Sequence, residues 1–302
     1  MKPAILIVGF ERPNNLIKIY NEVSNLKLPI YIFVDRCNKD ANFLNEATIS
    51  VAMKLTKNNV QNLKISEENF GVGRAVPRAI EWVLKSNESI IILEDDCIPN
   101  GTAIRFLTTT LETIKMNPKI AIVAASSPVK ESDQINSSFL SKYPLIWGWA
   151  TTRGKWNSLS RYTDMRVSSF EIIRKTIFRV DNWKSIAFFY AAHLRVKFGL
   201  LSAWDSNLAL GLILERKYAV VPNLNLITNV GNDEVASHTI ISQSNKQIII
   251  ASEGEPSTEI NSNNKEIDKI IESRIYSMKS RHLLSPLKAI IQVFLHKVRR
   301  VF

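Results

Sequence analysis

Short runs of apolar residues alternate, over the first 125 positions, with longer segments in which apolar residues recur at helical spacing. Such runs predict strands, here Ala4 to Val8, Ile30 to Val34, Leu63 to Ile65, Ile90 to Leu93 and Ile120 to Ala124. The segments PNNLIKIYNEVSNL, RAVPRAIEWVLKS and AIRFLTTTLETI predict helices between these strands, the first with Pro13 in its first turn. Repeated strand and helix units predict an α/β fold with a mainly parallel, Rossmann-like sheet flanked by helices.

Polar side chains follow three of the predicted strands at the point where each strand ends. Glu94, Asp95 and Asp96 come directly after the apolar run of SIIILEDDCIPNG. Residues 9–12 follow the first strand, and residues 35–36 follow the second. Ligands of open parallel sheets bind beyond the carboxyl ends of the strands. We therefore expect these three strand ends to face one crevice.

The three adjacent acids have two interpretations. They form a solvated turn or the cap of the next helix, or they belong to a ligand site. A diphosphate about 4 Å from a carboxylate is repelled by roughly 4 kcal/mol per charge pair at an effective dielectric near 20. Acids and phosphates therefore share a site through a divalent cation, and Mg²⁺ or Mn²⁺ takes one or two carboxylate oxygens together with phosphate oxygens and water. In the second interpretation the triplet predicts a metal-assisted nucleotide-diphosphate site.

The formal net charge of +11 indicates an anionic partner. Nucleic acid, an acidic lipid surface and a phosphorylated small molecule all fit that charge. The two cysteines, Cys37 and Cys97, have no metal-type spacing and do not form a secreted disulfide framework. The apolar start AILIVGF lacks a basic leader and a cleavage site, and no apolar run reaches the length of a membrane span. The expected location is the cytoplasm.

The chain beyond position 125 is less regular. The segment YPLIWGWATTRGKWNSL holds three of the six tryptophans, and ASEGEPSTEINSNN is polar and poor in core-forming residues. We predict a domain over residues 1–242, with a nucleotide-binding half at 1–125 and an acceptor half at 126–242, followed by a linker at 243–264. We expect residues 265–302 to form a C-terminal helical extension.

The C-terminal segment SPLKAIIQVFLHKVRRVF predicts a basic amphipathic helix. Such a helix can lie in an anionic membrane interface, which suits an enzyme with a lipid-linked acceptor. The alternative is a terminal helix that docks on its own domain or on a second copy in a homo-oligomer.

Five motifs in a fixed order carry a family resemblance: NFGVGRAVPRAIEWVL, LEDD, WGWATTRGKW, AWDSNLA and ASHT. Together they resemble a nucleotide-sugar glycosyltransferase of the GT-A fold. The likeness is to the N-acetylglucosaminyltransferase I group and to the bacterial family-2-like transferases related to it, and it extends from about Ala4 to Thr239.

The resemblance implies roles for residues on the predicted crevice. Asp96 matches the acid that binds the metal directly, and Glu94 and Asp95 match positions near the metal waters, ribose or donor sugar. Asp35 matches the acid that recognises the nucleotide base. Arg12 matches a basic residue that reaches the base or phosphate, with a surface helix cap as the alternative. The divalent cation implied is Mn²⁺ or Mg²⁺.

Two further polar residues lie next to predicted helix starts. Arg74 follows GVG, where a helix N-terminus and a guanidinium can both meet phosphate. Asp205 is the candidate catalytic base, since inverting transfer needs a carboxylate that takes the proton of the acceptor hydroxyl. Its alternative is to cap the helix that begins at the next residue. The eukaryotic relatives have two acids after the Trp, so the base is uncertain by one position, and Asp181 and Asp233 are reserves.

Three residues complete the expected site. His238 matches a Ser-His pair in a loop that, in the family, folds over the bound donor, where it contacts diphosphate or metal. Trp147 and Trp149 are expected to stack on an acceptor sugar, and their alternative is core packing.

The sequence thus predicts a metal-dependent, inverting hexosyl- or N-acetylhexosaminyltransferase that uses a UDP-sugar. Its acceptor would be a glycan or a lipid-linked glycan of bacterial surface polysaccharide or lipopolysaccharide synthesis, at the inner face of the cell membrane. A sugar nucleotidyltransferase is the alternative enzyme, but VGFERPNN lacks its Gly-rich triphosphate loop. A nucleic-acid-binding protein is favoured by charge alone, and seven of the 39 Lys and Arg residues lie after Ser273, so no nucleic-acid partner is expected. A sugar-binding protein that has lost transfer is the last alternative.

Overall fold

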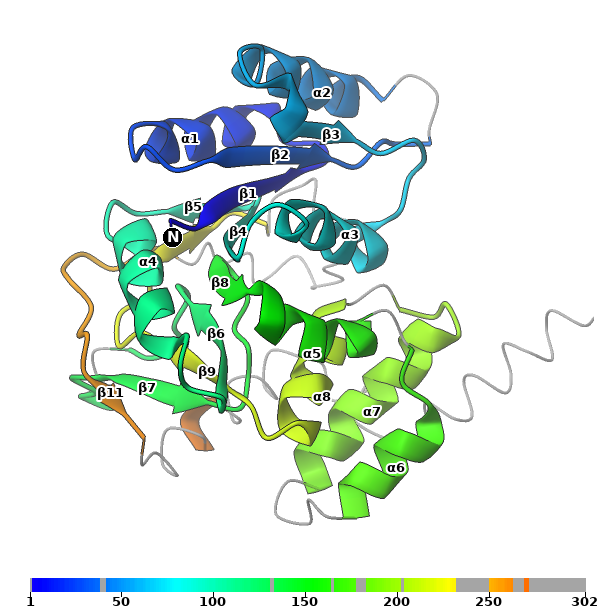
Figure 1. Ribbon diagram of the computed structural model, residues 1–302, viewed down its shortest axis with the longest axis vertical. Coiled ribbons are helices and arrows are strands. Elements are labelled where there is room, and N and C mark those ends of the chain that lie inside the picture. The colour runs from blue at the N-terminus through cyan, green and yellow to red at the C-terminus, as the bar shows by residue number, and fades with distance from the viewer. Residues whose placement is uncertain are drawn as a thin grey trace, which may run out of the picture.

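The computed structural model describes residues 2–38, 42–130, 133–163, 166–177, 183–201, 204–231, 250–262 and 269–271. Its central feature is a twisted sheet that runs from top to bottom of Figure 1, with helices on both faces. The sheet strands are β1 (Ala4–Gly9), β2 (Ile30–Val34), β3 (Leu63–Ile65), β4 (Ser89–Glu94), β6 (Ile120–Ala124), β7 (Ser138–Ser141), β8 (Trp149–Thr152), β9 (Tyr218–Val221) and β11 (Ile260–Asn261). Within the described residues these strands form one sheet in the order β11-β7-β9-β6-β8-β4-β1-β2-β3.

The first half of the sheet is parallel. Strand β1 pairs in parallel with β2 and with β4, and β2 pairs in parallel with β3. Strand β8 runs against both β4 and β6, while β9 is parallel to β6 and antiparallel to β7. The expected α/β architecture, a mainly parallel sheet flanked by helices, is confirmed.

Alternation of apolar side chains along β1 and β4 builds one core on each face of the sheet. Leu6 and Ile92 join the core that contains α3 (Val72–Leu84), α5 (Arg153–Thr163) and α8 (Trp204–Leu214). Ile7 and Ile91 join the core that contains α1 (Pro13–Ser24), α2 (Phe43–Leu55) and α4 (Ala103–Ile114). A strand buried on both faces needs apolar residues at consecutive positions, which is why these runs lack a polar alternation.

Helix α8 is the centre of the second half. It packs against α7 (Trp183–Lys197), α5 and α3, and it also contacts α6 (Ser169–Ile177). Every residue of α8 is buried except Asp205 in its first turn. A helix that is apolar on all sides is one surrounded by protein, and Asp205 is the residue of α8 that is only partly buried.

A small two-stranded ribbon lies beside the end of β4. Strand β5 (Cys97–Pro99) follows β4 after a two-residue turn and pairs antiparallel with β10 (Ile227–Asn229). Two segments that are about 130 residues apart in the sequence therefore meet here, because β10 pairs with β5.

The described part of the stretch expected as a linker, residues 250–262, contacts the sheet domain. Strand β11 pairs in parallel with β7, the Ser252 amide donates to the Asn225 carbonyl at 2.7 Å, and Arg105 pairs with Glu255. Of the expected C-terminal helical extension, 265–302, the structure describes residues 269–271, where Ile271 is buried in the core that contains α3. The amphipathic pattern from Ser285 onward lies outside the described residues.

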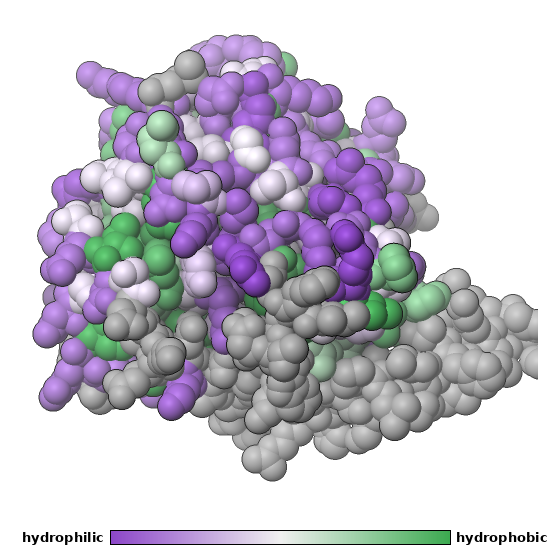
Figure 2. Space-filling model, turned by 60° about the horizontal axis from the view of Figure 1, so that its bottom comes forward, coloured by the Kyte–Doolittle hydropathy of each residue, from purple (hydrophilic) through white to green (hydrophobic). Residues whose placement is uncertain are grey.

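On the face in Figure 2, the coloured residues are mostly hydrophilic, with green hydrophobic areas separated by purple ones. Among the described residues, the most exposed large hydrophobic side chains come from different elements: Met116 after α4, Phe43 at the start of α2 and Phe170 on α6. Scattered exposed apolar residues of this kind are ordinary for a folded domain. Of the helices that the structure describes, none has the length and apolar character needed to cross a membrane.

Candidate active site

The carboxyl ends of β1, β2 and β4 meet at one edge of the sheet. In the parallel register Gly9 lies beside Val34, and Val8 lies beside Glu94. The loop after β1, the loop after β2 and the turn after β4 are therefore neighbours (Figure 1). This edge is where open α/β sheets bind ligands.

Asp95 joins the turn after β4 to the loop after β1. Its Oδ2 accepts a hydrogen bond from the Phe10 amide at 2.7 Å, and its Oδ1 accepts one from Arg12 Nη1 at 3.1 Å. Arg12 therefore lies beside the acidic triplet and is held by Asp95. Burial raises the pKa of Asp95 to about 6, although Arg12 and the Phe10 amide act to lower it.

Asp35 fixes the loop between β3 and α3. Its Oδ1 accepts from Ser66 Oγ at 2.8 Å and from the Phe70 amide at 3.0 Å, and its Oδ2 accepts from the Gly71 amide at 2.9 Å. Gly71 has φ of +67°, a conformation that glycine adopts without strain, and it is the N-cap residue of α3. The carboxylate of Asp35 therefore sets how α3 begins.

Asn45 connects two of these loops, and sequence reasoning missed it. Its Nδ2 donates to the carbonyls of Phe10 and Asp35 at 2.7 and 2.9 Å, and its Oδ1 accepts from the Cys37 amide at 3.0 Å. The side chain is buried in the first turn of α2. An asparagine inside a helical segment gives no signal in the sequence that distinguishes it from a solvated residue.

Arg74 lies in the first turn of α3, next to the loop that Asp35 holds. Its Nε donates to the Phe70 carbonyl at 3.1 Å, and its guanidinium lies 5.9 Å from the centre of the Phe70 ring. Arg78, one turn further along, lies 3.9 Å above the same ring. Both guanidinium groups are attached to exposed residues, so the start of α3 presents positive charge to the solvent beside the Asp35 loop.

Asp96 lies in the turn between β4 and β5. The Cys97 thiol donates to its Oδ1 at 3.0 Å, and the Val230 amide donates to its main-chain carbonyl at 2.9 Å. The residue after β10 thus fixes the backbone of Asp96. Cys97 itself is fully buried, and a buried free cysteine packs as a small apolar residue.

Negative charge is concentrated around Glu94. Burial raises the pKa of Glu94 well above its ordinary value, and the charges of Asp96, Asp95 and Asp205 raise it further. The guanidinium of Arg12 acts in the opposite direction. The charge of Asp205 in α8 therefore acts on Glu94, although the acidic triplet lies 109 or more positions before Asp205 in the sequence.

The donor chemistry of this cluster fits a hard divalent cation better than a soft one, because it consists of carboxylates. Within the part of the chain that the structure describes, no group of three or more His, Cys, Asp or Glu side chains is arranged to hold a metal ion. A divalent cation can also bind through one carboxylate, such as that of Asp96, with phosphate oxygens and water completing its shell. The residues present thus fit a cation shared with a phosphorylated ligand, and they do not form an all-protein cage.

The two tryptophans expected at an acceptor site occupy different environments. Trp149 is fully buried in β8, and its ring lies 6.1 Å from that of Trp156 and 5.9 Å from that of Trp204. Trp147 is partly buried against the other core. The core packing that the sequence left open as the alternative describes Trp149. His238, Asp181 and Asp233 lie outside the described residues.

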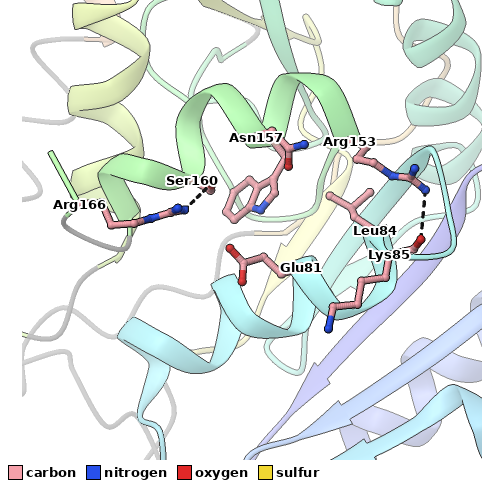
Figure 3. A pocket seen from close by; sticks show the side chains of 8 residues that line it. Glu81, Leu84, Lys85, Arg153, Asn157, Ser160 and Arg166 are labelled. Atoms are coloured by element: carbon pink, nitrogen blue, oxygen red, sulfur yellow. Dashed lines mark hydrogen bonds between the residues drawn. The ribbon is translucent and has the colours of Figure 1, made fainter.

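A separate groove of about 440 Å³ lies between α3 and α5 (Figure 3). Its lining residues are Glu81, Leu84, Lys85, Arg153, Trp156, Asn157, Ser160 and Arg166. Arg153 donates to the carbonyls of Lys85 and Asn87 and pairs with Glu88 at 2.8 Å, so it joins α5 to the loop before β4. Because that loop precedes β4, the groove lies at the opposite edge of the sheet from the acids and does not belong to the candidate site.

No family model matches the sequence, and no curated protein matches it. Among solved structures, the chain is similar to the mannosyltransferase PcManGT from Pyrobaculum calidifontis in complex with GDP-Man and Mn²⁺. The sequence identity is 12%, the TM-score is 0.40, and the match covers 70% of each chain. Similarity at this level does not establish a shared activity, so the residues at the edge of the sheet have to carry any functional assignment.

Proposed function

We propose that this protein is a metal-dependent, nucleotide-sugar glycosyltransferase of the GT-A type. The observation that carries the proposal is the crowding of Glu94, Asp95, Asp96 and Asp205 at the ligand-binding edge of a mainly parallel α/β sheet. Burial, together with the charges of the other three acids, raises the pKa of Glu94, and a buried negative charge of this kind lowers the stability of the protein unless a cation joins it. Such clusters are typical of functional sites.

Asp96 is the proposed ligand of the cation. Its neighbour Asp95 already accepts hydrogen bonds on both oxygens, from Phe10 and Arg12, whereas the Asp96 carboxylate accepts one from a thiol. A thiol is a weak donor, so it competes poorly with a divalent cation for the carboxylate. When bound, the cation would neutralise the diphosphate and stabilise it as a leaving group.

The start of α3 is the proposed diphosphate and nucleotide contact. Arg74 provides a guanidinium next to the positive end of the helix, an arrangement that favours phosphate. The Oδ2 atom of Asp35 accepts one hydrogen bond, from the Gly71 amide, and a carboxylate oxygen can accept a second. We propose that the second comes from a nucleotide base. Arg12, through its pairing with Asp95, is the proposed contact to the base or phosphate.

Asp205 is the proposed general base. In a single displacement the acceptor oxygen forms a bond to the anomeric carbon while the bond from that carbon to the diphosphate oxygen breaks, and Asp205 takes the hydroxyl proton. The anomeric configuration is inverted. The position of Asp205 supports this role, because it is the one residue of α8 that is not buried and its charge reaches Glu94.

The finer parts of the proposal rest on the motif resemblance. They are a UDP-sugar as donor, transfer of a hexosyl or N-acetylhexosaminyl group, and His238 as a residue that closes over the donor. They also include a glycan or lipid-linked acceptor of bacterial surface polysaccharide or lipopolysaccharide synthesis. The proposed setting is the cytoplasmic face of the membrane, with the basic helix of 265–302 in contact with anionic lipid.

Calorimetric titration with UDP and GDP, each with and without Mn²⁺, tests the proposal. We expect one nucleoside diphosphate to bind in the presence of Mn²⁺ and to bind at least tenfold more weakly without it. Failure of both nucleotides to bind under either condition would contradict a transferase. Release of diphosphate from a nucleoside triphosphate in the presence of a sugar 1-phosphate would instead favour the nucleotidyltransferase.

A further inference from the structure

The ribbon of β5 and β10 holds the turn that carries Asp96. Asn229 lies opposite Cys97 in the antiparallel register, and the next amide, that of Val230, donates to the Asp96 carbonyl. The Asn229 side chain then accepts a hydrogen bond from the Gly231 amide at 3.0 Å. The chain after β10 therefore passes directly over the Asp96 side chain.

Gly231 lies against the Asp96 carboxylate. A β-carbon at Gly231 would lie 2.3 Å from Asp96 Oδ2, 3.1 Å from its Cγ and 3.2 Å from Asn229 Oδ1. Ordinary contacts of carbon atoms in proteins begin at roughly 3.5 Å. Any side chain at position 231 therefore competes with the carboxylate for the same space.

We propose that Gly231 is a positioning residue for Asp96. This inference deepens the proposed function and rests on it, because Asp96 is the proposed cation ligand. The absence of a side chain at Gly231 lets the carboxylate keep the orientation in which Oδ1 accepts from the Cys97 thiol and Oδ2 faces the backbone of residue 231. An alanine there would turn the carboxylate away.

The atoms that meet the added carbon decide what the substitution does. At Gly231 they are the ends of the Asp96 and Asn229 side chains, which rotate at little cost. At Gly148, by contrast, φ is +65° and a β-carbon would lie 2.5 and 2.9 Å from the buried side chain of Ile227. A substitution at Gly148 disturbs the core, whereas one at Gly231 changes the direction of a carboxylate.

The test compares Gly231→Ala with Gly101→Ala, both after strands of the ribbon. A β-carbon at Gly101 meets nothing within 4 Å, so this variant is the matched control. We expect Gly231→Ala to keep a cooperative melting curve but to bind Mn²⁺ at least tenfold more weakly than the wild type. Electron paramagnetic resonance with the nucleoside diphosphate present measures this binding. Gly101→Ala should bind like the wild type.

A double-mutant cycle separates positioning from a general structural effect. In an Asp96→Asn background, Gly231→Ala should cause no further loss of Mn²⁺ binding. If the wild type binds Mn²⁺, equally strong binding by Gly231→Ala would overturn the inference, and so would an equal additional loss in the Asp96→Asn background. Loss of cooperative unfolding in Gly231→Ala would also overturn it, since only side-chain ends stand in the way.

A metal-free measurement distinguishes this inference from the proposed function. The ¹³C chemical shift of the Asp96 carboxyl carbon, assigned with Asp96→Asn, should change in Gly231→Ala and stay constant in Gly101→Ala. If the wild type binds no Mn²⁺ but this shift changes, the proposed function fails and the positioning role holds. An unchanged shift would contradict the positioning role.

Discussion

The acids at the carboxyl edge of the sheet fall into two groups with different surroundings. Asp35 and Asp95 are buried and accept hydrogen bonds from backbone amides and side chains of neighbouring loops. Among the described residues, the Asp96 carboxylate accepts a hydrogen bond from the Cys97 thiol, and Glu94 lies close enough to Asp96, Asp95 and Asp205 for their charges to act on it. Both groups lie within the same few loops.

The two groups of acids therefore have different roles, one structural and one in the proposed reaction. A carboxylate that accepts several amide hydrogen bonds stabilises the loops that donate them. Burial and the charges of Asp96, Asp95 and Asp205 raise the pKa of Glu94, and this cost favours a bound cation. The first group therefore builds the site, and we infer that the second group, together with Asp205, performs its reaction.

The largest effect is expected at Asp205. Asp205→Asn removes the proposed base and should lower the rate of sugar transfer by about 10²- to 10⁴-fold. Binding of the nucleoside diphosphate should stay within about threefold, because the base faces the acceptor and not the donor. The measurement is steady-state transfer together with calorimetry. Full transfer activity would place the base on another residue.

The next largest effect is expected at Asp35, on the free energy of unfolding. Asp35→Ala leaves the Ser66 hydroxyl and the amides of Phe70 and Gly71 without their acceptor, which should lower the free energy of unfolding by about 3 to 5 kcal/mol. Urea denaturation measures this loss. A change below about 0.5 kcal/mol, the size typical of surface substitutions, would mean that Asp35 does not fix the loop.

Asp95 should make the free energy of unfolding depend on pH with a sign opposite to that of most salt-bridged acids. Its pKa is raised from 3.8 to about 6 in the folded protein, so between about pH 4 and pH 6 the folded state holds a proton that the unfolded state has lost. The free energy of unfolding therefore falls as the pH rises through this range, by up to about 3 kcal/mol for this group.

Denaturation at pH 4 and pH 7 without metal, for the wild type and Asp95→Asn, measures that contribution. The stability of the wild type relative to Asp95→Asn should decrease as the pH rises. A difference that grows with pH would show that the bonds from Arg12 and Phe10 outweigh burial, and Asp95 would then behave as an ordinary paired acid.

The strands and the edge that carries the acids follow from the sequence, because buried parallel strands need continuous apolar runs. The runs Ile30 to Val34, Leu63 to Ile65 and Ile120 to Ala124 coincide with β2, β3 and β6, and the helix at 103–114 coincides with α4. Helix α2 gave no such signal, since its exposed Phe43, Leu44 and Met53 weaken the separation of polar and apolar faces.

The parts of the site that the sequence does not predict depend on contacts between distant segments. The ribbon of β5 and β10 consists of strands of three residues, which have no periodic pattern of their own. Asn45 and Gly231 act through hydrogen bonds and a close approach that only the folded chain creates. Local pattern therefore identified the acids, but it did not identify the residues that orient them.

The central claim is that Asp96 holds a divalent cation through which a nucleoside diphosphate binds among the acids. Calorimetric titration of Asp96→Asn with UDP and GDP, with and without Mn²⁺, tests this claim most directly. We expect the variant to fold like the wild type and to lose at least tenfold of the Mn²⁺-dependent part of nucleotide binding. Mn²⁺-dependent binding of the same strength in Asp96→Asn and the wild type would contradict it.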